Sequence, residues 1–211
     1  PMTRSAALIL LPMLLLASCA TNSTRHVMLV SVRDQKMGVY QEGRRVATYP
    51  ISTSKFGLGD KPGSNRTPIG KMEVARKIGC GQPLGMVFKG RRPTGEILSP
   101  NAPGRDPIVT RILWLRGNEA KTKNAYRRFI YIHGTPEERK IGRPASYGCI
   151  RMRSHDVARL YRQVGVGTKV EVTMGPLPAP QVAQQMKRAA SAVGGAVYNV
   201  ATLGGGIRNK S

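Results

Sequence analysis

Short apolar stretches separated by polar turns run through most of the chain. Several of them alternate between apolar and polar residues, and a period of two is typical of β-strands with one buried face. The pattern predicts strands over residues 27–32, 36–40, 45–53, 71–78, 111–116, 128–133 and 168–174. Because polar, glycine-containing connections join these stretches, we expect a mainly β domain with minor α content, built as a mixed or antiparallel sandwich.

One segment has a helical period instead. Ser154 can cap its first turn, Asp156 favours the positive helix end, and Gly165 is expected to end it. Its apolar residues lie at positions i, i+3, i+4 and i+7, on one helix face: Val157, Leu160, Tyr161 and Val164. The sequence therefore predicts one helix, which we expect to pack beside the functional site.

Two stretches are rich in glycine and proline. Residues 57–66 form a loop by composition, and residues 79–107 contain six glycines and five prolines. That density predicts no long regular element in the second stretch. A loop of such length inside a compact domain is usually functional or disordered, and here we expect a lid or the wall of a substrate groove. Residues 175–211 resemble a flexible basic tail.

The N-terminus resembles an export signal. Ala6–Leu16 is an apolar run of eleven residues, whereas a membrane span needs about 20. Leu16-Ala17-Ser18-Cys19 resembles a bacterial lipobox. This resemblance implies a signal peptide over 1–18, lipid on Cys19 and a tether over 19–26, with the catalytic domain at 27–174. We therefore expect an exported, membrane-anchored lipoprotein that faces the periplasm or cell wall, at the outer membrane if the cell has two membranes.

The charge is strongly positive. Lys and Arg number 34 against 11 Asp and Glu, a formal net charge of +23. Such a field concentrates anionic partners, which include nucleic acid and the anionic bacterial envelope. Only 5% of the residues are aromatic, which is poor material for stacking bases, and no helix-turn-helix or zinc-finger spacing occurs. We therefore expect no nucleic-acid partner, and we expect a monomer.

Candidate chemistry centres on Cys149 and His133. An imidazole can take the proton of a thiol and make it a nucleophile, and Gly148 would let a carbonyl approach the backbone closely. With Cys19 and Cys80 the chain has three cysteines, and this odd number argues against a disulfide framework. We expect Cys80 to be a partly buried thiol without a function. No His, Cys and acidic residues have metal-ligand spacing, so neither a metal nor another cofactor is expected.

Two motifs carry a family resemblance. His133-Gly134, a gap, and then Ser146-Tyr147-Gly148-Cys149-Ile150-Arg151 resembles the signature of the L,D-transpeptidase (YkuD-type) family, and Thr67-Pro68-Ile69-Gly70 resembles its upstream turn. The resemblance spans roughly residues 27–174. It implies the family's β-sandwich fold and an enzyme that acts on peptidoglycan stem peptides.

The resemblance also implies a reaction and a role for each residue. Cys149 would attack the carbonyl between diaminopimelate and D-Ala of a donor tetrapeptide stem, with His133 as base, and D-Ala would leave. An amine of a second stem would resolve the thioester and form a 3→3 cross-link. Gly134 would orient the imidazole, amides of Tyr147, Gly148 and Cys149 would hold the oxyanion, and Ser146 and Arg151 would bind within the site or to substrate.

One position departs from the family pattern, and alternatives stay open. The family usually has His where this chain has Tyr147, which can donate one hydrogen bond but carries no positive charge at neutral pH. The group that accepts the acyl group from Cys149 is therefore left open. The same Cys–His pair could serve an L,D-carboxypeptidase, or attach protein to the wall or cleave it. A second alternative is a non-catalytic, basic lipoprotein that binds the wall.

Overall fold

The computed structural model describes residues 25–178, and this part of the chain is mainly β. Its strands and helices follow one another in this order: β1 (His26–Ser31), β2 (Lys36–Gln41), β3 (Arg44–Pro50), β4 (Gly70–Ile78), β5 (Met86–Lys89), β6 (Arg92–Ile97), β7 (Ile108–Gly117), η1 (Ala120–Thr122), β8 (Tyr131–Gly134), η2 (Glu138–Lys140), β9 (Ile150–Met152), α1 (Ser154–Gln163) and β10 (Lys169–Thr173). The prediction of a mainly β domain with one helix is confirmed.

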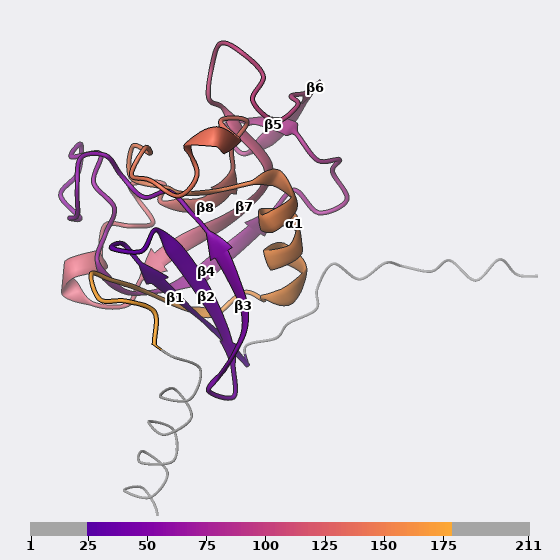
Figure 1. Cartoon of the computed structure of the whole chain (residues 1–211). Coiled ribbons are helices and arrows are strands. Elements are labelled where there is room, and N and C mark those ends of the chain that lie inside the picture. The colour runs from indigo at the N-terminus through magenta and orange to yellow at the C-terminus, as the bar shows by residue number, and fades with distance from the viewer. Residues whose placement is uncertain (1–24, 179–211) are drawn as a thin grey trace, which may run out of the picture.

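The described strands form one mixed, hydrogen-bonded sheet. Its order is β3-β2-β1-β10-β4-β7-β5-β6, and β8 pairs with both β7 and β9. Strands β1 and β10 are parallel, as are β8 and β9, and the other pairs are antiparallel. Figure 1 shows the β5–β6 hairpin at the far end of the molecule from β1, β2 and β3.

Two apolar clusters lie on opposite faces of β8 and its neighbours. The main core contains Ile132 of β8 and Ile150 of β9, together with Val157 and Leu160 of α1. The second cluster contains Tyr131 and, partly buried beside it, Cys149. Successive side chains of a strand point to opposite faces. Helix α1 therefore packs on β7 and β8 from the main-core side, and Figure 1 shows it beside these strands.

Helix α1 has the predicted apolar face but different ends. Ser154 is its first residue, the capping position belongs to Arg153, and no side-chain cap is made. The Ser154 hydroxyl instead accepts a hydrogen bond from Thr110 at 2.8 Å. The helix ends at Gln163 because Val164 is extended, before Gly165 is reached. The two predicted end signals are therefore wrong in position, although the helix itself is confirmed.

Residues 79–107 contain a β-hairpin where the sequence predicts no long regular element. Strands β5 and β6 pair through Phe88↔Pro93 and Lys89↔Arg92, and Gly90 and Arg91 make the turn. Every residue of β6 is exposed. A strand with no buried face has no alternation of apolar and polar residues, so its sequence gives no strand signal.

Two further differences concern single segments. Residues 128–130, predicted as the start of a strand, form a turn before β8, with Phe129 at a left-handed φ of 57°. Cys80 is partly buried against the main core, as expected, but it is disulfide-bonded rather than a free thiol. None of the helices within residues 25–178 is long and apolar enough to cross a membrane. The predicted signal peptide and Cys19 lie outside the described residues, as does the chain beyond 178.

Candidate active site around Cys149 and His133

The parallel pairing of β8 and β9 places the two predicted reactive residues on one face of the sheet. Ile132 pairs with Ile150, and both side chains enter the main core. Their neighbours His133 and Cys149 therefore point to the opposite face. Cys149 lies one residue before β9, so it is a diagonal neighbour of His133. The sequence distance between them is closed by the loop that returns from β8 to β9.

A single hydrogen bond fixes the ring of His133. Its Nδ1 lies 2.8 Å from the carbonyl oxygen of Gly134. A carbonyl oxygen only accepts, so Nδ1 carries the proton and the lone pair of Nε2 is left to take another. Glycine is required here because a Cβ on Gly134 would lie 2.6 Å from the carbonyl oxygen of Val109. The contact with Gly134 orients the imidazole.

Burial keeps both members of the pair neutral. The side chain of His133 is buried, and the loss of water lowers its pKa from 6.5 to about 4, although Gly134 and the charge of Asp106 oppose this. Burial raises the pKa of the Cys149 thiol to about 11, against smaller opposing effects of the Tyr131 amide and of two arginines. At neutral pH the resting pair is therefore a thiol and an imidazole, not a thiolate and an imidazolium.

The thiol rests on the backbone of the segment before β8. The amide of Tyr131 donates to Sγ at 3.4 Å, and Sγ donates to the carbonyl of Phe129 at 3.4 Å. The contacts within residues 25–178 include no hydrogen bond between Cys149 and His133. Catalytic hydrogen bonds are often long in a free enzyme and tighten when substrate binds. Transfer of the proton to Nε2 therefore requires the thiol hydrogen to leave Phe129.

Ser146 holds the turn that presents the cysteine. Its hydroxyl donates to the carbonyl of Cys149 at 2.6 Å and accepts from the amide of Gly148 at 3.2 Å. Its own carbonyl and amide are bonded to Lys55 and Thr53. Ser146 is buried, and its hydroxyl makes both of these bonds within the site. It shapes the backbone around Cys149.

The same turn offers amides for an oxyanion. Gly148 has a φ of +119°, and a Cβ there would approach the carbonyl oxygen of Arg66 to 3.3 Å, so a residue with a side chain would be strained and crowded. The amide of Gly148 is occupied by Ser146. The amides of Tyr147 and Cys149 make no hydrogen bond to any described residue. These two of the three predicted donors are thus free in the structure.

Arg151 has partners in its own chain, which the sequence does not predict. Its guanidinium is buried, with only 3% exposed, and its Nη1 bonds to Asp106 and, at 3.1 Å, to Glu137. Asp106 also accepts from Thr135. Two carboxylates of the same chain therefore engage Nη1 of Arg151, which the sequence predicts to pair with a substrate carboxylate. Its Nε and Nη2 are buried without a partner in the described residues.

Tyr147 stands at the surface beside a lysine. Its side chain is 61% exposed, its hydroxyl accepts from Nζ of Lys55 at 3.0 Å, and its ring contacts that of Phe56 at 5.5 Å. Tyrosine brings no positive charge to this position, but Lys55 does. A cation thus lies beside the turn that precedes Cys149, on a neighbouring loop.

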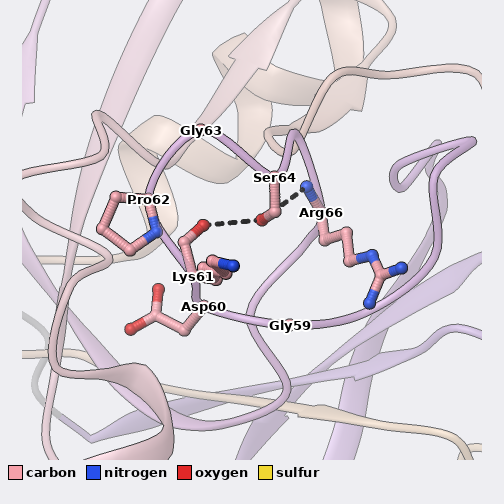
Figure 2. Close-up of a pocket in the computed structure, with 7 residues that line it drawn as sticks. All are labelled: Gly59, Asp60, Lys61, Pro62, Gly63, Ser64 and Arg66. Carbon is pink, nitrogen blue, oxygen red and sulfur yellow. Dashed lines mark hydrogen bonds between the residues drawn. The ribbon is translucent and has the colours of Figure 1, made fainter.

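A buried arginine shapes the loop that closes the other side of the turn. Arg128 pairs with Asp60 at 3.0 Å, and their side chains are only 8% and 7% exposed. Arg128 also donates to the carbonyls of Gly59 and Arg66. Residues of this loop line a pocket of about 590 Å³. Figure 2 shows the lining residues, among which the Ser64 hydroxyl donates to the carbonyl of Lys61. The carbonyl of Arg66 faces Gly148.

Several of these residues carry no sequence signal. Asp106, Glu137, Arg128 and Lys55 lie in loops or turns, outside both motifs. Isolated charged residues in loops are usually solvated, so only the fold shows that they converge. Within residues 25–178, no group of three or more His, Cys, Asp or Glu residues is placed to hold a metal ion.

The site is that of a potential cysteine nucleophile with a backbone-oriented histidine on a mixed β-sheet. A family model described as the L,D-transpeptidase catalytic domain, YkuD, matches residues 25–172, and the chain belongs to this family. The match covers both motifs as well as the strands that carry them.

Among curated proteins, the chain is 28% identical over 160 residues to the "Probable L,D-transpeptidase YcfS" of Escherichia coli (strain K12). The alignment covers 74% of this chain and 46% of that protein, so the chain spans about half the length of this relative. Among solved structures, it aligns with an L,D-transpeptidase from Mycobacterium smegmatis with a TM-score of 0.45, 18% identity and coverage of 71% and 58%. Bdellovibrio bacteriovorus Bd1075 gives a TM-score of 0.48, 15% identity and coverage of 80% and 55%.

Proposed function

We propose that this chain is a peptidoglycan L,D-transpeptidase that transfers an acyl group through a thioester on Cys149. The observation that carries the proposal is the shared sheet face of Cys149 and His133, together with the bond that fixes the imidazole by Nδ1. Family membership supports the reaction class. The acyl group is the diaminopimelate carbonyl of a tetrapeptide stem, and D-Ala leaves.

The pKa values of Cys149 and His133 in the free protein define how the nucleophile is formed. Since the thiol and imidazole are both neutral at rest, Nε2 of His133 takes the thiol proton as sulfur bonds to the carbonyl carbon. The carbonyl oxygen becomes negative in the amide hole of Tyr147 and Cys149. The imidazolium then gives its proton to the leaving D-Ala nitrogen, the C–N bond breaks and the thioester remains. Such a base contributes a factor of about 10²–10⁴ to the rate.

The second half of the reaction decides the product. The side-chain amine of another stem's diaminopimelate attacks the thioester carbonyl, and His133 takes a proton from that amine. The C–S bond breaks as the amide forms, and the imidazolium returns the proton to sulfur to restore the thiol. Water in place of the amine would give a trimmed tripeptide and an L,D-carboxypeptidase. A protein lysine would attach protein to the wall. The exposed surface beside Tyr147, where Lys55 lies, is accessible to an acceptor of any of these kinds.

Intact-mass measurement after incubation with a carbapenem and, separately, with diaminopimelate tetrapeptide stems tests the proposal. We expect a covalent adduct on Cys149 in both cases, and with stems a product mass that reveals the acceptor. Cys149→Ala should abolish both adducts, whereas Cys80→Ala should retain them.

A chain that binds cell walls in a salt-sensitive way, regardless of Cys149, and forms no adduct with carbapenem or stem would contradict the proposal. That result would support the non-catalytic alternative, a basic wall-binding protein. The amine, water and protein-lysine versions of the enzyme would all fail together.

A further inference from the structure

Arg91 occupies a backbone position that an arginine seldom adopts. It forms the two-residue turn between β5 and β6 together with Gly90, and both residues have positive φ, 58° and 68°. Turns of this kind favour Gly, Asn or Asp, because a Cβ is crowded in the left-handed region. Strained residues of this kind gather at functional sites. The position of the Arg91 side chain is therefore informative.

The guanidinium of Arg91 lies over two aromatic rings. Its central carbon is 4.9 Å from the ring centre of Trp114 and 5.2 Å from that of Phe129. Trp114 is itself stacked on Tyr126, with ring centres 4.2 Å apart. The rings hold the planar group by cation–π attraction and restrict its motion. The Arg91 side chain also lies beside the hydroxyl of Tyr131, where it lowers the pKa of that phenol against the raising effect of burial.

Two of these aromatic residues also contact Cys149 through their backbone. The amide of Tyr131 and the carbonyl of Phe129 are the two hydrogen-bond partners of the Cys149 sulfur, each at 3.4 Å. Tyr131 and Trp114 also share the apolar cluster against which Cys149 packs. Arg91 therefore reaches the cysteine's surroundings from a hairpin that is remote in sequence.

The charge of Arg91 is left unmatched. It is partly exposed, and none of the carboxylates in residues 25–178 forms an ion pair with it. Arg151, by contrast, is buried and doubly paired. A guanidinium that is restrained by two rings and partly exposed can offer two parallel N–H groups, the geometry that binds a carboxylate in bidentate fashion.

We propose that Arg91 binds a free carboxylate of the acyl-donor peptide while its carbonyl lies against Cys149. This inference rests on the proposed function, and it makes Arg91 a specificity residue for that reaction. A donor stem carries a carboxylate on its terminal D-amino acid and another on the far end of diaminopimelate. Arg91 binds one of these two carboxylates, which is the role that the sequence alone suggests for Arg151.

The test compares the full chain with Arg91→Asn, since Asn tolerates the left-handed turn and removes the charge. Three donors are used: the tetrapeptide stem, the stem amidated at its C-terminal carboxyl, and the stem amidated at the second diaminopimelate carboxyl. The rate of acyl-enzyme formation is followed by intact mass. We expect the wild type to slow by about 10–100-fold on one amidated donor, the range set by a hydrogen-bonded charge pair. The variant should be slow on the unmodified stem and indifferent to that amidation.

Arg92→Asn is the matched control, because Arg92 is the next residue and exposed, and it should behave like the wild type. Alkylation of Cys149 by neutral iodoacetamide should be equal in all three proteins, which shows that the site is intact. If the wild type acylates but Arg91→Asn discriminates between donors as the wild type does, this inference alone fails. If the wild type forms no acyl-enzyme with any stem although iodoacetamide reacts, the proposed function fails and this inference falls with it.

Discussion

His133 and Arg151 are direct partners on the parallel strands β8 and β9, so an imidazole and a guanidinium share one face of the sheet. A buried cation beside the base would by itself disfavour the imidazolium, and Arg151 does lower the pKa of His133. The carboxylates of Asp106 and Glu137 pair with Arg151 and offset its charge. His133 thus lies beside an arginine that is paired with two carboxylates, rather than beside a lone arginine.

The first prediction concerns the pH dependence of thiol reactivity. Because burial raises the pKa of Cys149 to about 11, the rate of its alkylation by iodoacetamide should climb about tenfold per pH unit above neutrality without levelling near pH 8. His133→Gln should leave this profile nearly unchanged, since the resting imidazole is neutral. A plateau centred between pH 6 and 8 would instead show a thiolate–imidazolium pair and would contradict the neutral resting state.

The second prediction concerns stability in acid. The pKa of His133 is lower in the folded protein than its ordinary 6.5, so the unfolded chain binds this proton more readily than the folded one. The free energy of unfolding should therefore fall as pH drops from about 6.5 towards 4. Urea denaturation at several pH values measures this slope, and His133→Gln should reduce it. An equal slope in the variant would show that other groups, such as the carboxylates, account for all of it.

The third prediction concerns Asp106. Asp106→Asn removes the charge that pairs with Arg151, and we expect a loss of about 1–3 kcal/mol in the free energy of unfolding. The pKa of His133 should fall further, because the charge of Asp106 raises it. Chemical denaturation and an NMR titration of the imidazole measure the two effects.

Glu137→Gln is the matched control for Asp106, since it also pairs with Arg151 but is not among the groups that shift the pKa of His133. It should cost stability while leaving that titration nearly unchanged. Equal shifts of the His133 pKa in the two variants would contradict a specific effect of Asp106.

The fourth prediction concerns the loop around the pocket of Figure 2. Asp60→Ala leaves the buried Arg128 without its carboxylate and should cost about 3–5 kcal/mol. Arg128→Lys keeps the charge but cannot reach the separate acceptors that its fork reaches, so amides of residues 57–66 should exchange hydrogen faster. Unchanged exchange in that segment would mean that Arg128 does not hold the loop.

The fifth prediction concerns Cys19, where the sequence predicts a lipid. Mass spectrometry of the protein isolated from membranes should find an acylated N-terminus at Cys19, and Cys19→Ala should release the protein from the membrane fraction. Cys80 is disulfide-bonded in the structure, and a thioether on Cys19 would leave no sulfur there for a disulfide with Cys80. A mature protein with a Cys19–Cys80 disulfide would therefore contradict lipidation. Detergent extraction of the wild type under the same conditions is the control.

The sequence by itself determines the elements whose signal is local. The apolar alternation predicts β1, β4 and β7 within a few residues, and the helical period predicts α1, because burial of one face imposes those periods. The two motifs identify Cys149, His133 and the Gly134 that orients the ring, since motif residues recur at fixed spacing. The sequence does not predict the hairpin of β5 and β6, because β6 is fully exposed and needs no apolar face.

Only the tertiary structure decides which charges meet. Arg151 pairs with Asp106 and Glu137, Arg128 pairs with Asp60, and Arg91 contacts the aromatic rings beside Cys149. Each contact spans a distance in sequence that no local pattern encodes. Water solvates a charged side chain in a loop whether or not it has an ion-pair partner. The residues around it in the sequence therefore do not reveal which partner it has. The register of β8 against β9 and the folding of the long loops determine these contacts, and with them the charges around Cys149.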